Sequence, residues 1–352
     1  MRISRRRFGA WLGVSTLAGG LFGRVSPTAF ASEAEPEMRR TIERELKRVK
    51  VPSLQPPWRL PVEWYRAAVG RLQERLREEK LGGALLTNHL NHNYFGGFFL
   101  TQTERPMWLW IPATGDPVFF HPGLDRDLAS SWWIKDHEWY FDFHHSGAYN
   151  QVAWAAGPEA DLWQWVCEGL KKRGAGQGKL ALDSEPVPSL AAKLKQHLPE
   201  VEWTSQEKEI LRMRQVKTSE EIGLIRKAIA LHDAMLEFAR GYILEHGTAA
   251  SDYEVGIATS EFGTRKLMEA LGPELDGRPH TGVGLDLGFG CRTGVATAYP
   301  HPNQFFFKRI ERGDAIQIAS LIRIGGYGGE GYRACHIAPM PELGKKLWEV
   351  HT

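Results

Sequence analysis

The chain has 352 residues, with 44 Lys or Arg against 42 Asp or Glu and a formal charge of +2. This length allows about two domains at ~100–200 residues each, and the near-neutral charge gives no electrostatic reason to expect a nucleic-acid partner. The three cysteines, Cys167, Cys291 and Cys335, show neither zinc-ligand spacing nor the even number of a disulfide framework.

Residues 1–31 have the pattern of an export signal. Arg5 and Arg6 precede the uncharged, glycine-rich stretch Phe8–Gly23, which is shorter than the ~20 apolar residues of a membrane span. The segment resembles a twin-arginine signal peptide, and the small residues of Ala29–Ala31 predict cleavage before Ser32. Cleavage would remove five arginines and no acidic residue, so the charge would change from +2 to −3. We therefore expect a periplasmic or secreted protein without a stable membrane span, with uncleaved anchoring as the alternative.

The mature chain is expected to begin with an extended lead-in over residues 32–61, because prolines are frequent near its end. An amphipathic helix is predicted over Val62–Lys80, where apolar residues recur at helical spacing. Strands are then predicted over Gly83–Leu86, Trp108–Ile111, Pro117–Phe120, Trp139–Phe143, Lys179–Leu182 and Val201–Trp203, and helices over Pro158–Lys172 and Pro188–Leu198. This alternation predicts an α/β domain over residues 62–205 with a largely buried sheet.

Residues 206–352 have a different character, with two long helices before a glycine-rich part. Capping boxes at Thr218–Glu221 and Ser251–Glu254 predict helices that run to about Glu245 and about Leu271. His232 falls on the apolar stripe of the first helix and is interpreted as a core residue. The stripe consists of Ile222, Ile225, Ile229, Leu236 and Ile243.

The segment after these helices predicts β structure around a turn. Ala315–Ile318 and Leu321–Ile324 are expected to form a strand pair or one long strand. The run Gly325–Gly329 lacks the lysine of a phosphate-binding loop and is interpreted as a tight turn between strands.

Four segments resemble the creatinase/aminopeptidase P/prolidase family. Leu211–Gly247 (LRMRQVKTSEEIGLIRKAIALHDAMLEFARGYILEHG) is similar to the opening of that family's catalytic domain, and Asn91–Phe98, Pro300-His301 and Gly313–Arg333 agree with it. The resemblance covers residues from about 62 to 340. It implies an α/β fold class: a creatinase-type N-terminal α/β domain at 62–205, followed by a partial pita-bread (α+β) catalytic domain at 206–352.

The resemblance also implies a divalent metal, Mn, Zn or Co. The family's metallopeptidases hold two ions with two aspartates, a histidine and two glutamates, so that one shared water is activated. The two aspartate positions correspond here to Ala319, which cannot ligate a metal, and Glu330, which is a candidate ligand. The remaining ligands belong to a second half of the fold that this sequence does not contain. We therefore expect a C-terminally incomplete catalytic domain with an incomplete metal site.

His301 and Glu330 are the candidate catalytic residues. His301 matches a family position that handles protons or binds the reacting group, and a histidine suits this role because its ordinary pKa is about 6.5. A surface histidine beside Pro300 is the alternative interpretation. Arg333 is a candidate substrate-binding residue by the same resemblance.

Three functions are consistent with these residues. The first is an exported hydrolase of C–N bonds of the Xaa-Pro peptidase type, inactive as this chain stands, which takes a peptide substrate. The second is a metal-independent, creatinase-like hydrolase of a small amidino or N-methyl compound. The third is a pita-bread protein that binds a ligand without turning it over. The resemblance also implies a homodimer.

Overall fold

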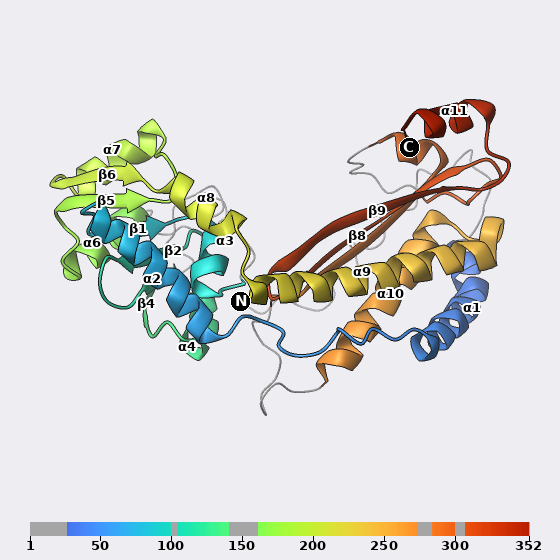
Figure 1. Cartoon of the computed structure of the whole chain (residues 1–352), viewed down its shortest axis with the longest axis horizontal. Helices are drawn as coiled ribbons and strands as arrows, with labels where there is room; N and C mark the ends of the chain where they lie inside the picture. The colour runs from blue at the N-terminus through green and yellow to red at the C-terminus, as the bar shows by residue number, and fades with distance from the viewer. Residues whose placement is uncertain (1–26, 100–104, 141–160, 273–283, 300–306, 352) are drawn as a thin grey trace, which may run out of the picture. The chain divides into compact units, whose positions relative to one another are not determined.

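The computed structural model of the protein describes residues 27–99, 105–140, 161–272, 284–299 and 307–351 (Figure 1). The chain divides into two compact units, with α1 (Pro27–Arg48) in the first and everything from Val49 onward in the second. The expected extended lead-in is wrong over residues 32–48, which are helical. Ion pairs Arg39–Glu35 and Arg48–Glu45, at i,i+4 and i,i+3 spacing, support this helix. The twin-arginine segment lies outside the described residues.

The first part of the second unit is a six-stranded mixed sheet with the order β4-β3-β2-β1-β5-β6. β1 pairs antiparallel with β2 and parallel with β5, which is parallel to β6. Its strands are β1 (Gly83–Leu86), β2 (Trp108–Pro112), β3 (Val118–Pro122), β4 (Asp136–Tyr140), β5 (Gly178–Leu182) and β6 (Val201–Ser205). Its helical elements are α2 (Val62–Glu78), α3 (His89–Asn91), η1 (His92–Gly96), η2 (Gly123–Asp125), α4 (Arg126–Ser131), α6 (Leu162–Lys172), α7 (Pro188–His197) and α8 (Glu207–Gln215). The predicted strands and helices of this part are confirmed within a few residues, except that residues 141–143 of one strand and 158–160 of one helix lie outside the described residues.

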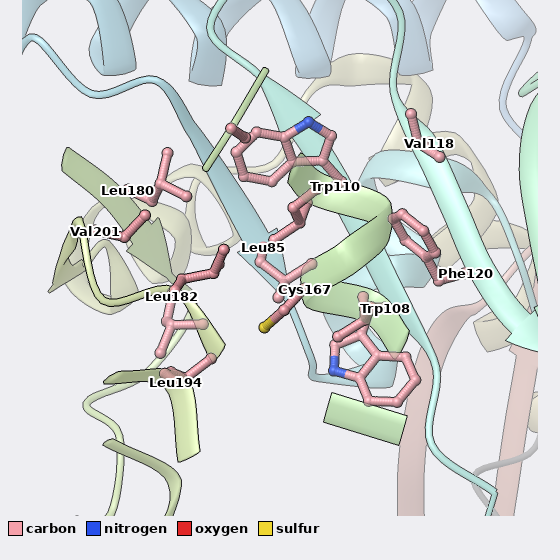
Figure 2. Packing of buried hydrophobic residues seen from close by; sticks show 14 of the residues in the cluster. Leu85, Trp108, Trp110, Val118, Phe120, Cys167, Leu180, Leu182, Leu194 and Val201 are labelled. Atoms are coloured by element: carbon pink, nitrogen blue, oxygen red, sulfur yellow. The ribbon is translucent and has the colours of Figure 1, made fainter. Parts of the chain in front are cut away.

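Strands β1, β2 and β3 are buried on both faces because they are apolar at successive positions. All four residues of β1 are buried, as expected for a strand covered from two sides. One face packs on α6 around Cys167, as Figure 2 shows, and α2 contacts β1 and β2. The apolar cluster on this face includes Leu85, Trp108, Phe120 and Leu182 of the sheet and Leu194 of α7. The strand ends are thereby held in fixed positions.

The second part of the unit places a three-stranded antiparallel sheet, order β7-β8-β9, against two long helices (Figure 1). Both predicted capping boxes are present, at Thr218 before α9 and at Ser251 before α10. The elements are α9 (Ser219–His246), η4 (Gly247–Ala249), α10 (Asp252–Leu271), β7 (Asp286–Thr293), η5 (Gly294–Ala298), β8 (Ala315–Ile324), β9 (Tyr327–His336) and α11 (Glu342–His351).

Some details differ from the sequence-based expectations. The stripe assigned to α9 is wrong in part, because Ile222 and Ile229 are 37% and 48% exposed, while Leu224, Leu231 and Met235 are buried. β8 is the one long strand that was among the two predicted alternatives, whereas β7 and β9 were not predicted. The glycine run forms a turn at Gly325 and Gly326, both with positive φ, but Tyr327 already begins β9. No helix in the described ranges is long and apolar enough to cross a membrane.

Candidate functional site

The two faces of the three-stranded sheet have different surroundings. In β8 the even-numbered residues are buried, with Ile318 and Ile322 almost inaccessible, and α9 packs on β8 and β9. The odd-numbered residues, Ala319 among them, lie on the other face and are only partly buried, apart from the exposed Arg323. We call this second surface the open face. By register it contains Gly288, Gly290 and Arg292 of β7, Gln317, Ala319 and Leu321 of β8, and Glu330 and Tyr332 of β9.

Glu330 lies on the open face, directly opposite Leu321. Its side chain is exposed, and the hydroxyl of Tyr332, two residues along the strand, donates a hydrogen bond of 2.5 Å to its Oε2. This bond raises the pKa of Tyr332, because Glu330 stabilises the protonated phenol. The pair therefore presents a carboxylate oriented by a phenol, with one oxygen left to accept a proton or bind a cationic group.

The centre of the open face has small residues. Gly290, Ala319 and Tyr332 face one another across the three strands. On the neighbouring register position, the Arg292 guanidinium donates from Nη1 to Gln317 Oε1 at 3.2 Å and to the Tyr299 carbonyl at 3.0 Å. Gly290 and Ala319 therefore separate the Glu330 carboxylate, with its partner Tyr332 on β9, from the Arg292 guanidinium on β7.

The sequence analysis did not single out Arg292, Gln317 or Tyr332. The alternation of β8 would have placed Gln317 on the face of Ala319, because side chains two apart share a face. No such signal existed for Arg292, since β7 contains glycines at 288 and 290 and was not predicted as a strand.

The described residues of the open face do not fit the two-metal site implied by the sequence resemblance. Ala319 provides no donor atom, and Glu330 has no second carboxylate opposite it across the strands. In the described part of the chain, no three His, Cys, Asp or Glu side chains come close enough to hold a metal ion.

Arg333 does not share the open face with Glu330. It pairs with Ile318 in the register and is therefore on the face toward α9. There its charge, added to the larger effect of burial, lowers the pKa of His232. Side chains three residues apart on a strand leave opposite faces, so a contribution of Arg333 to substrate binding would not come from the open face.

His232 is a buried residue of α9, as predicted from the sequence, and it connects the helix to the sheet by a hydrogen bond. Its ring is 8% exposed, and its Nδ1 is hydrogen-bonded to Ser320 Oγ of β8. A Cβ built on Gly331 of β9 would overlap the same ring. Glycine at position 331 therefore lets β9 lie close under His232 and fixes the strand that carries Glu330.

His301 lies outside the described residues. Its pairing with Glu330 and the catalytic roles of both residues stay predictions.

Comparisons with known proteins support the fold. The model of the Creatinase/Prolidase N-terminal domain matches residues 69–216. A creatinase from Bacillus sp. (strain B-0618) is 21% identical over 286 residues, which cover 80% of this chain and 62% of that protein. The prolidase from Thermococcus sibiricus superposes with a TM-score of 0.59 at 18% identity, covering 81% of this chain and 69% of the prolidase.

A third similar protein is the Xaa-Pro dipeptidase from Bacillus anthracis. Its structure superposes with a TM-score of 0.56 at 19% identity and covers 81% of this chain and 69% of the dipeptidase. The chain spans only 57% and 62% of the length of two curated relatives that it matches.

Proposed function

We propose that this protein is a hydrolase of C–N bonds. It belongs to the creatinase/prolidase family, because residues 69–216 match the Creatinase/Prolidase N-terminal domain and the chain has the fold of solved prolidases. The predicted family and the predicted α/β, pita-bread fold are confirmed. The proposed substrate class is a peptide with a proline after its first residue, as the names of the similar prolidase and dipeptidase suggest. The observation that carries the proposal is the open face, an accessible sheet surface with Glu330 on its edge strand β9.

The proposed chemistry uses Glu330 and His301. Hydrolysis adds water across a C–N bond, so one group must take a proton from the water and another must give a proton to the leaving nitrogen. We assign Glu330, oriented by Tyr332, to take the proton from the water, and His301 to give a proton to the leaving nitrogen.

A second candidate is metal-independent hydrolysis of a small amidino or N-methyl compound. Ala319 favours it, because a carboxylate is missing where a two-metal site requires one. Glu330 would then pair with the cationic part of the substrate. The similarity to a creatinase over 286 residues is in line with this candidate.

Turnover measurements separate these functions. The purified protein, first treated with a chelator, is assayed against alanyl-proline and against creatine, each with and without added Mn²⁺, Zn²⁺ or Co²⁺. Metal-dependent cleavage of alanyl-proline supports the peptidase, whereas metal-independent cleavage of creatine supports the second candidate. If neither substrate is cleaved but either binds in calorimetry, the chain binds ligand without catalysis and the hydrolase proposal is wrong.

We further propose export by the twin-arginine route and assembly as a homodimer. The support for export is the pattern of residues 1–31, and that for the dimer is the family resemblance.

A further inference from the structure

A polar pocket opens at one edge of the six-stranded sheet, within the N-terminal domain. The parallel strands β1, β5 and β6 end at this edge, followed in turn by Thr87, Asp183 and Gln206. The pocket has a volume of about 440 Å³ and is closed by α8. Small ligands of open α/β sheets commonly bind at the carboxyl ends of parallel strands. None of its lining residues belongs to the open face.

The floor of the pocket is rigid because Asp183 ties three neighbouring residues together. Asp183 is 5% exposed. Its carboxylate accepts hydrogen bonds from the Thr87 amide and hydroxyl and from the Asn88 amide, each at 2.9 Å, and from Asn91 Nδ2 at 2.8 Å. The buried carboxylate is thus fully occupied by donors and holds the Asn91 side chain in one orientation.

Asn91 in turn positions the guanidinium of Arg214 at the pocket. Its Oδ1 accepts a hydrogen bond of 3.0 Å from Nη1 of Arg214. Arg214 is half-buried and lines the pocket, yet among the described residues it forms no ion pair with a carboxylate. Four of its five N–H groups have no acceptor in that part of the protein. A held guanidinium with unused donors is suited to receiving an anion.

The other walls restrict which anion fits. Leu90 and Leu211 line the pocket with 44% and 47% of their surfaces exposed, and an apolar ligand would cover them. The carboxylates of Asp183 and Glu207 also line the pocket; they repel any anion, and a doubly charged one such as phosphate more strongly than a singly charged one. One cation beside apolar surface matches a single carboxylate on an apolar body.

We propose that this pocket binds a small organic monocarboxylate with an apolar body, the chemical class of apolar amino acids and short peptides. The carboxylate contacts the Arg214 guanidinium, and the apolar part lies on Leu90 and Leu211. The site is independent of the proposed hydrolysis on the open face, so either can fail without the other.

Calorimetric titration of the full chain tests the proposal with three probes: N-acetyl-leucine, leucinamide, which lacks the carboxylate, and inorganic phosphate. We expect N-acetyl-leucine to bind and the other two to bind at least tenfold more weakly. Arg214→Gln should weaken N-acetyl-leucine by about ten- to a hundred-fold, since a hydrogen bond to a charged group is lost. Arg212→Gln, at an exposed position of the same helix, should leave the affinity unchanged.

Leu211→Glu provides a second variant, because its exposed position should tolerate the change and its charge should repel the carboxylate. It should weaken N-acetyl-leucine at least tenfold even if Arg214→Gln does not fold. The proposal is overturned if N-acetyl-leucine does not bind, if leucinamide or phosphate binds as tightly, or if Leu211→Glu has the affinity of the unchanged protein.

Discussion

Adding one methyl group at Gly331 should destabilise the sheet that carries Glu330. A Cβ at position 331 would come within 2.6 Å of Cε1 of His232 and would overlap the imidazole ring. The ring is 8% exposed and bonded to Ser320, so it cannot move away without breaking that hydrogen bond. Overpacking of this kind costs about 1–3 kcal/mol, so Gly331→Ala should lower the free energy of unfolding by about that amount.

Gly329 provides a matched control on the same strand and face. A Cβ there meets nothing within 4 Å, and Gly329 is not among the glycines with positive φ. Gly329→Ala should therefore be neutral or stabilise the protein by about 0.4–1 kcal/mol, because alanine restricts the unfolded chain.

Urea unfolding at pH 7, followed by tryptophan fluorescence, measures both variants. A double-mutant cycle with His232→Ala identifies the cause, since removal of the ring should cancel most of the cost at position 331. Equal stability of Gly331→Ala and Gly329→Ala, or an undiminished cost in the His232→Ala background, would refute the proposed packing.

Three further predictions concern acid stability, the two faces of β9 and export. Burial lowers the pKa of His121 to about 4, so the free energy of unfolding should be unaffected by this residue above the unfolded pKa of about 6.5 and should fall by up to about 3 kcal/mol as the pH drops toward 4. His121→Gln should make the urea stability depend less on pH in this range, and an unchanged slope would contradict the lowered pKa of His121. Arg333→Gln should leave substrate turnover unchanged because Arg333 lies on the face opposite Glu330, and a tenfold loss in kcat would disprove that separation. Lysine in place of both Arg5 and Arg6 should keep the precursor in the cytoplasm, whereas unchanged processing in a cell-fractionation assay would exclude the twin-arginine route.

Local signals in the sequence predicted the elements that are determined by neighbouring residues in the chain. The capping boxes at Thr218 and Ser251 start α9 and α10 as expected, because a hydroxyl and a glutamate three residues apart satisfy backbone amides without help from distant residues. Short apolar runs such as Gly83–Leu86 became strands because only a buried sheet accommodates them. Helix α1 gives a weaker signal, because prolines follow it and ion pairs at i,i+4 and i,i+3 spacing contribute only a few tenths of a kcal/mol each.

The site was less predictable because it depends on pairing between distant segments. β7 and β9 are glycine-rich and show no apolar alternation, so only their register with β8 reveals that Arg292, Ala319 and Glu330 share a face. The placement of Glu330 and Arg333 on opposite faces follows only once β9 is known to be a strand. Arg214 in the N-terminal pocket gave no sequence signal, since its role depends on Asn91, more than 100 residues earlier.

The most direct test of a catalytic open face is the turnover of Glu330→Gln on whichever substrate the unchanged protein cleaves. Glu202→Gln is the matched control, because it makes the same change at an exposed residue of β6. The account predicts a fall in kcat of about 10²–10⁴-fold for Glu330→Gln, with the urea midpoint and the turnover of Glu202→Gln unchanged. Turnover by Glu330→Gln equal to that of the unchanged protein would contradict the account.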